Sequence, residues 1–285
     1  SILSPTIYTI THFFTANGVI PEEDNAFPSE DQWYEVATGN TNNVINLCVG
    51  REPRFYANLS FNGDQYSSVI ANGKETILDF TNPQGAGYNT TLFGNNNNNV
   101  TGFLNKKWVH PNIRYTGVGW GSNMGNMNNY ATPLMRLGEL YLMAAECYAH
   151  IDGGTTKGLE YLNKIRKRAG IPEWTETKLG AAGKTLLDAV LEERFVELYY
   201  EGQRFHDIRR YCKGREYLSK HCYQGLDAYR YAPTLEQLNT VVQIDQPFDW
   251  DDRLYLMPIP DSELYSNPQL ENHKNYIHKL EIQNL

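Results

Sequence analysis

This amino-acid sequence predicts a mainly α-helical fold, with tetratricopeptide-like helical hairpins, long irregular loops and a small β-hairpin region. Residues 1–132 are rich in Asn, Gly, Thr and Tyr and show no long helical periodicity, whereas apolar residues recur at helical spacing from residue 133 onward. We therefore expect a loop-rich region at 1–132 and a helical region with an extended C-terminal tail at 133–285. The two regions are expected to form one unit.

The loop-rich region contains a few local signals of regular structure. Ser29 and Gln32 have the spacing of a capping box, which predicts the start of a short helix. Residues 55–61 alternate in the manner of a strand, and the Asn62-Gly63 pair after them is a hairpin signal. The polar run at residues 95–99 predicts a loop tip.

The helical region begins with the pattern of a tetratricopeptide unit. Leu134, Leu137, Gly138 and Tyr141 fit its first helix, and the segment from Gly158 to Pro172 fits its second. Small residues allow the two helices to approach closely. We expect one packed face on each helix, formed by Leu140, Tyr141 and Ala145 on the first and by Leu159, Leu162 and Ile165 on the second.

A second hairpin is predicted from residue 185 to 201 and from 204 to 212, with Gly202 at the bend. Arg194 and Arg209 lie within the apolar face of this segment, and Glu201 lies towards its edge. A buried arginine needs a carboxylate partner, so we expect Glu197 and Glu201 to pair with Arg194. Carboxylates paired in this way stay ionised, which favours a structural role over acid–base catalysis.

Composition excludes some classes of function. The chain of 285 residues carries a formal net charge of −8, and its basic residues form no patch, so a nucleic-acid partner is not expected. No run of 18 apolar residues is present, so no membrane-spanning helix is expected. The tail at Pro258 and Pro260 is predicted to be extended and to lie over the helices.

The charged segment at 192–210 also resembles a known family. Its pattern, E-E-R-x-x-E-L-x-x-E-G-x-R-x-x-D-I-R-R, is similar to the hallmark of the SusD/RagB family. Four further stretches resemble family motifs in the same order, at residues 52–57 (E-P-R-F-Y-A), 133–146, 162–172 and 256–268 (including M-P-I-P). The departures are Glu52 for Asp, Gly138 for Ala and Met257 for Trp or Tyr.

This resemblance implies a SusD-like fold and a non-enzymatic glycan-binding lipoprotein of the outer membrane. Such a protein binds an oligosaccharide or polysaccharide and delivers it to a TonB-dependent outer-membrane transporter. Family members are nearly twice as long, so we expect this chain to be a C-terminal portion, with the N-terminal helices absent or on another chain. A naturally short homologue is the alternative. Membrane attachment would use a lipid anchor outside this sequence.

Aromatic side chains are the candidate ligand-binding residues, because sugar rings stack their C–H faces on aromatic planes. Residues 1–132 are accordingly expected to face the ligand. The resemblance favours Tyr8, Phe13, Trp33 and Tyr34, which lie before the E-P-R-F-Y-A motif. Tyr66, Trp108 and Trp120 are further candidates. For each ring, packing in the core is the competing explanation. Arg194, Glu197, Glu201, Arg204 and Arg209 are assigned structural roles.

Other functions remain open. A peptide-binding tetratricopeptide-type adaptor, or a peptide-capturing SusD-like protein, would use a smooth helical groove. A glycoside hydrolase would need two carboxylates in a cleft beside the aromatic residues. No catalytic motif is present, and neither a cofactor nor a metal is expected, although residues 249–252 (D-W-D-D) could hold calcium. Cys212 and Cys222 could form a disulfide in an exported protein.

Overall fold

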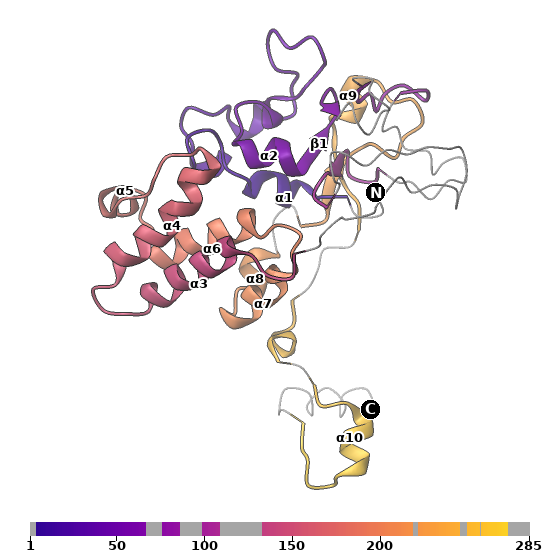
Figure 1. Ribbon diagram of the computed structural model, residues 1–285. Coiled ribbons are helices and arrows are strands. Elements are labelled where there is room, and N and C mark those ends of the chain that lie inside the picture. The colour runs from indigo at the N-terminus through magenta and orange to yellow at the C-terminus, as the bar shows by residue number, and fades with distance from the viewer. Residues whose placement is uncertain are drawn as a thin grey trace.

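The computed structural model describes residues 4–66, 76–85, 99–108, 133–218, 222–245, 250–256 and 258–272. Across these ranges the chain is mainly helical, with three two-stranded antiparallel sheets. Figure 1 shows the N-terminal elements, in indigo and purple, lying against the helices of the second half, in pink and orange. The predicted mainly α-helical fold with small β elements is confirmed.

The N-terminal segment consists of short helices joined by turns. These are α1 (Ile7–His12), η1 (Pro21–Glu23), η2 (Glu30–Gln32), η3 (Asn46–Cys48) and α2 (Pro53–Asn58). The helix predicted from Ser29 is only the single 3₁₀ turn η2, because the Ser29 side chain binds Gln32 Oε1 instead of capping a backbone N–H. Short helices of this kind depend on packing for stability.

The sheets differ from the predicted hairpin. β1 (Leu59–Phe61) pairs with β4 (Phe103–Asn105), and β2 (Gln65–Tyr66) pairs with β3 (Thr76–Ile77). The predicted strand at residues 55–61 is wrong over most of its length, because Pro53 opens a helix there with its fixed φ. Gly63 does turn the chain, with φ +81°, but β1 does not pair with β2. β5 (Gln224–Leu226) pairs with β6 (Val241–Gln243).

The first predicted helical hairpin is present as α3 (Leu137–Ala149) and α4 (Thr155–Ala169). Ala145, Leu162 and Ile165 are buried between helices, as the pattern indicates. Leu140 is not, since 45% of it is exposed. Gly158 lets α4 approach the next hairpin, because a Cβ there would lie 2.4 Å from Leu186 Cδ2.

The second hairpin consists of α6 (Leu186–Glu197) and α7 (Gln203–Arg210), preceded by α5 (Glu176–Ala181) and followed by α8 (Gly214–Tyr217). Thr185 begins α6 with a complete capping box to Asp188. Gly202 has φ +80° at the start of α7, so its predicted place at the bend is confirmed. α6 ends at Glu197, four residues earlier than expected.

The hydrophobic core joins the two halves of the chain. One cluster combines rings of the N-terminal segment, such as Phe13 and Phe55, with Val196 of α6 and Leu226 of β5. A second cluster lies among α3, α4 and α6 and includes Leu142, Leu162 and Val190. Because the first cluster takes residues from both segments, they share one core.

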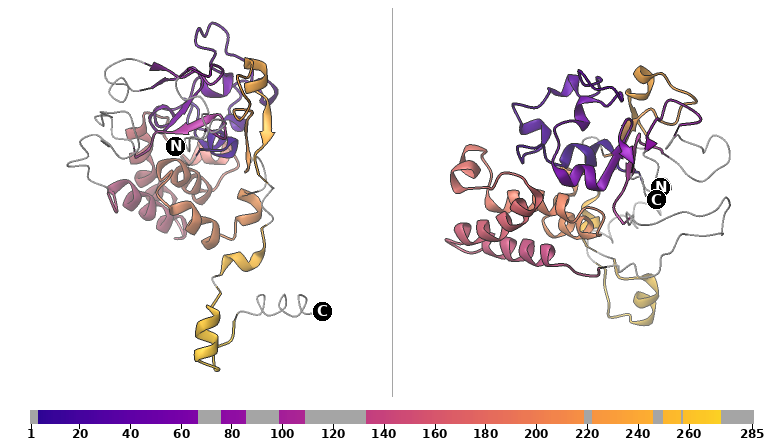
Figure 2. Two further views of the ribbon diagram at one scale, coloured as in Figure 1. Left: turned by 90° about the vertical axis from the view of Figure 1, so that its right-hand side faces the viewer. Right: turned by 45° about the horizontal axis from the view of Figure 1, so that its top comes forward.

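The C-terminal part contains α9 (Leu235–Leu238), η5 (Asp252–Tyr255) and α10 (Asp261–Ser266). Figures 1 and 2 show α10 standing away from the other helices in every view. The expectation that the tail lies over the helices is therefore wrong, and none of the residues in α10 is buried. Among the described residues, no helix combines the length and apolarity needed to cross a bilayer.

Candidate functional site

A buried network of charges joins the N-terminal segment to α6. Arg54 of α2 binds Glu52 at 2.7 Å, Glu193 at 2.7 Å and Glu197 at 2.9 Å. Glu193 is completely buried and also binds Arg166 of α4 at 2.9 Å. One carboxylate therefore lies between two guanidinium groups, which satisfies charges that would be costly to bury alone.

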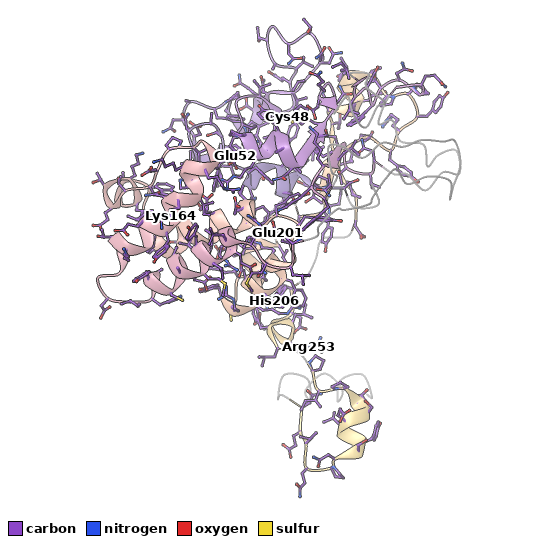
Figure 3. The ribbon with its side chains drawn as sticks, in the orientation of Figure 1. Cys48, Glu52, Lys164, Glu201, His206 and Arg253 are labelled. Atoms are coloured by element: carbon purple, nitrogen blue, oxygen red, sulfur yellow. The ribbon has the colours of Figure 1, made fainter. Side chains whose placement is uncertain are left out.

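The end of α6 continues this network. Glu197 binds Arg136, Arg168 and Arg54, and Glu201 binds Arg136 and Lys107. Burial alone would raise the pKa of Glu197, but these positive groups outweigh it and hold the pKa below its ordinary value. The pKa of Glu201 is lowered in the same way. Figure 3 labels Glu52 and Glu201, which belong to the two ends of the network.

Arg194 does not use the carboxylates predicted for it. Its Nε lies 2.9 Å from Oδ2 of Asp207 on α7, and 3.6 Å from Oε2 of Glu146 on α3. The prediction of Glu197 and Glu201 as partners is wrong for two reasons. Glu197 faces the arginines of other segments, and Glu201 lies beyond the end of α6, where Tyr200 adopts a φ of +61°.

Arg204 and Arg209, the other two arginines with a predicted structural role, stack on aromatic rings. The Arg204 guanidinium lies 4.6 Å from the ring centroid of Phe195 and 4.0 Å from that of Tyr217. It donates a hydrogen bond of 2.7 Å to the hydroxyl of Tyr8. Arg209 lies 3.6 Å from the ring centroid of Phe205. The Arg204 contacts tie α7 to α1, α6 and α8 and add cation–π attraction, whereas the Arg209 contact lies within α7.

The aromatic residues predicted to bind ligand lie mostly in the core. Phe13 is fully buried, 1% of Trp33 and 8% of Tyr8 are exposed, and Tyr34 is half-buried against the same core. Trp33 Nε1 donates to the carbonyl of Pro28 at 2.8 Å. In this structure Phe13 and Trp33 offer no ring face to solvent. A ligand role for the four residues stays a prediction, and only Tyr8 supports a cavity wall, through Arg204.

Of the further aromatic candidates, Tyr66, Trp108 and Trp120, the structure describes only the side chain of Trp108. Trp108 is partly exposed, has φ +68° and donates its Nε1–H to the carbonyl of Tyr200 at 3.0 Å. Trp120, the predicted loop tip at residues 95–98 and Asp249 of the D-W-D-D segment lie outside the described residues, as does the side chain of Tyr66. Asn99, at the end of that polar run, is buried.

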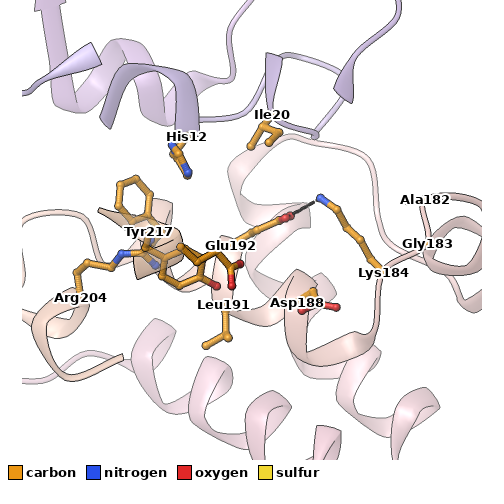
Figure 4. Close-up of a pocket in the computed structure, with 12 residues that line it drawn as sticks. His12, Ile20, Ala182, Gly183, Lys184, Asp188, Leu191, Glu192, Arg204 and Tyr217 are labelled. Carbon is orange, nitrogen blue, oxygen red and sulfur yellow. Dashed lines mark hydrogen bonds and ion pairs between the residues drawn. The ribbon is translucent and has the colours of Figure 1, made fainter. Parts of the chain in front are cut away.

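A cavity of about 350 Å³ opens between the two halves of the chain. Figure 4 shows its wall, with the Lys184–Glu192 ion pair on one side and Arg204 with Tyr217 on the other. The lining comes from α1, the turn after it, the α5–α6 turn, α6, α7 and α8: His12, Ile20, Ala182, Gly183, Lys184, Asp188, Leu191, Glu192, Phe195, Arg204, Glu216 and Tyr217.

The cavity combines apolar surface with hydrogen-bonding groups. Leu191, Phe195 and Ile20 supply apolar surface. Burial raises the pKa of Tyr217 to about 12, so its hydroxyl stays protonated at neutral pH. Burial also raises the pKa of Glu192, although Lys184 lies 2.6 Å from it and favours the charged form. This combination suits a small polar ligand with apolar faces.

Sequence reasoning missed most of this cavity. Lys184, Asp188 and Tyr217 belong to no motif, and each has an ordinary helical or turn position in the sequence. The available signals were Glu192 and Arg204, which the charged motif contains and which line the cavity. No cluster of His, Cys, Asp and Glu suited to a metal ion occurs within the described ranges. All four cysteines, which lie in those ranges, are free, so Cys212 and Cys222 form no disulfide.

The fold defines a helical protein built on tetratricopeptide-like hairpins, with a cavity between its two segments. Comparison with known proteins gives the family. The sequence matches the SusD family profile over residues 1–276, and the chain belongs to that family. The resemblance noted in the sequence is confirmed. SusD-like proteins are nutrient-binding proteins of the outer membrane rather than enzymes.

Relatives agree with this assignment. The chain is 28% identical over 171 residues to SusD-like protein P2 of Formosa agariphila. The matched segment covers 59% of this chain and 30% of that protein. The solved structure of BT4246 has a TM-score of 0.84 at 42% identity, covering 95% of this chain and 46% of the other. A SusD-like protein (BF3747) from Bacteroides fragilis has a TM-score of 0.67 at 27% identity, covering 95% and 47%. The chain therefore spans less than half the length of these relatives.

Proposed function

We propose that this protein binds oligosaccharides at the cell surface and delivers them to a TonB-dependent outer-membrane transporter. The observation that carries the proposal is family membership over residues 1–276. Attachment to the membrane would be through a lipid anchor outside this sequence. Peptide capture within the same family is the alternative class of ligand.

We propose that the two segments of the chain have different roles. Residues 133–285 form the helical scaffold, and residues 1–132 contribute to the ligand-facing side. The cavity supports this division, because His12 and Ile20 of the first segment line it together with α6 and α8 of the second. Aromatic rings and hydrogen-bonding groups meet there, and these are the groups that recognise sugars.

Capture and release require no covalent step. The motif carboxylates Glu197 and Glu201 are ion-paired and have lowered pKa values, which suits a structural role better than proton transfer. A delivery protein must also release its ligand. We therefore expect a Kd on the order of 10 µM to 1 mM, equivalent to roughly −4 to −7 kcal/mol.

The test is affinity electrophoresis of the full-length protein in gels that contain neutral polysaccharides, one per gel. Retardation by at least one polysaccharide, together with co-purification of a TonB-dependent transporter, is expected. Unchanged mobility in every gel, with binding to peptides in calorimetry, would replace the oligosaccharide with a peptide ligand. Absence of both ligands and of the transporter would overturn the proposal.

A further inference from the structure

The cavity between α1, α6 and α8 has a charge balance that selects its ligand. Two cations, Lys184 and Arg204, and three carboxylates, Asp188, Glu192 and Glu216, line it, which leaves one net negative charge with His12 neutral. An anionic ligand would add repulsion to this wall. A cationic ligand would compete with Lys184, which lies 2.6 Å from Glu192.

Hydroxyl groups fit this mixed wall better than either kind of ion. A hydroxyl both donates and accepts hydrogen bonds, so it can accept from Lys184 or Arg204 and donate to Asp188 or Glu216. A ligand with several hydroxyls and no charge satisfies both kinds of group at once. The apolar residues of the cavity require that the same ligand also has C–H faces.

The cavity has aromatic surface for those faces. The Arg204 guanidinium lies against the Tyr217 ring at 4.0 Å, and Tyr217 also borders the cavity. Arg204 is itself fixed by Phe195 and by the hydroxyl of Tyr8. This wall is therefore preorganised, which lowers the entropy cost of binding.

The cavity is large enough for a ligand of one sugar ring. At about 350 Å³ it lies near the lower end of the range of small-molecule sites, which runs from roughly 300 to 1,000 Å³. We infer that this cavity is a subsite for a single uncharged sugar residue at a chain end or branch. This inference rests on the proposed function. It adds the place where one sugar residue binds and states that this sugar residue is uncharged.

Two adjacent alanines offer a matched test of this subsite. Ala182 and Ala181 are both exposed at the end of α5, but only Ala182 lines the cavity. Ala182→Trp should fill the cavity without disturbing the core, and Ala181→Trp should leave it open. Calorimetry of the full-length protein would use glucose, galactose, mannose and xylose, with oligosaccharides cut from the polysaccharide that retards it in gels.

Ala182→Trp should weaken binding at least about tenfold, because a filled pocket excludes the ring, while Ala181→Trp binds like the unsubstituted protein. A second pair supports the test. Glu216→Gln should weaken binding by about threefold through a lost charge-assisted hydrogen bond, and Glu160→Gln should not. Glu216 and Glu160 are equivalent surface residues, each paired with a lysine three residues before it at 2.5 Å.

The outcomes separate this inference from the proposed function. Equal binding by Ala182→Trp and the unsubstituted protein would overturn the subsite and leave oligosaccharide binding intact. Cutting the polysaccharide shorter increases the number of chain ends per unit mass, so a chain-end site should then bind the carbohydrate more strongly per unit mass. A fall in affinity per unit mass would therefore also overturn the subsite. Failure of the unsubstituted protein to bind any of these sugars would overturn the proposed function, and the subsite with it.

Discussion

Arg194 on α6 binds Asp207 on α7 through two hydrogen bonds, from Nε to Oδ2 at 2.9 Å and from Nη2 to Oδ1 at 3.0 Å. Both residues are at least 95% buried. This paired geometry fixes the two helices of the second hairpin side by side. The charged motif thus acts as the internal framework of the fold.

Removing one member of this pair should be costly. Asp207→Asn leaves the Arg194 charge buried with a weaker partner, so we expect a loss of about 3–5 kcal/mol in the free energy of unfolding. Urea denaturation followed by circular dichroism measures it. The control is Asp252→Asn, which breaks the exposed pair with Arg215 and should cost less than about 1 kcal/mol. Equal losses in the two variants would contradict a framework role.

Gly202 should be needed for its backbone conformation alone. It has φ +80°, and a Cβ there would meet nothing within 4 Å, so Gly202→Ala should cost about 1 kcal/mol of stability through backbone strain. Gly180, inside α5, also has open space but lacks a positive φ. Gly180→Ala should therefore stabilise by roughly 0.5–1 kcal/mol. Thermal denaturation distinguishes the two, and shifts of the same sign would contradict the argument.

The ion-paired carboxylates should make stability depend on pH. The pKa values of Glu146, Glu197 and Glu201 lie below their ordinary value of 4.5 in the folded state. Their contribution is complete above about pH 4.5 and is lost as the pH falls through the lower folded values. Glu52 and Glu192, whose pKa values burial raises, act in the opposite direction.

Denaturation midpoints measured from about pH 7 to about pH 3 test this dependence. We expect stability to fall below about pH 4.5, and Glu197→Gln should make that fall shallower while lowering stability at pH 7. A slope identical in Glu197→Gln and the unsubstituted protein would show that this carboxylate is not ion-paired in the fold.

The cysteines should react according to their exposure. Cys147 and Cys212 are exposed, whereas Cys48 is buried and burial raises its pKa. A thiol reagent should label Cys147 and Cys212 quickly in the native protein and Cys48 only after unfolding. A mass lower by two hydrogens in protein purified without reductant, with Cys212 and Cys222 unlabelled, would instead show a disulfide.

Local signals in the sequence predicted the helical hairpins well. Apolar periodicity located α3, α4 and α6, and Gly202 marked the bend, because each depends on residues close together in the chain. The segment at residues 55–61 failed because its alternation suited a strand while Pro53 favoured a helical first turn. The alternation and the proline predicted different structures there, and the chain adopts the helix that the proline favours.

Contacts between distant segments were not predictable in the same way. The motif indicated that Arg194 needed a carboxylate, but spacing along one helix suggested Glu197, and the fold supplied Asp207 from the next helix. The cavity was missed for the same reason, since α1, α6 and α8 come together only in the folded chain. Burial of Trp33 likewise depends on tertiary packing.

We propose that this SusD family member binds an uncharged oligosaccharide. The most direct measurement is affinity electrophoresis of the full-length protein against neutral polysaccharides, with Ala182→Trp and Ala181→Trp run in the same gels. We expect retardation of the unsubstituted protein and of Ala181→Trp, with a clear loss for Ala182→Trp. Unchanged mobility of the unsubstituted protein in every polysaccharide gel would contradict this proposal.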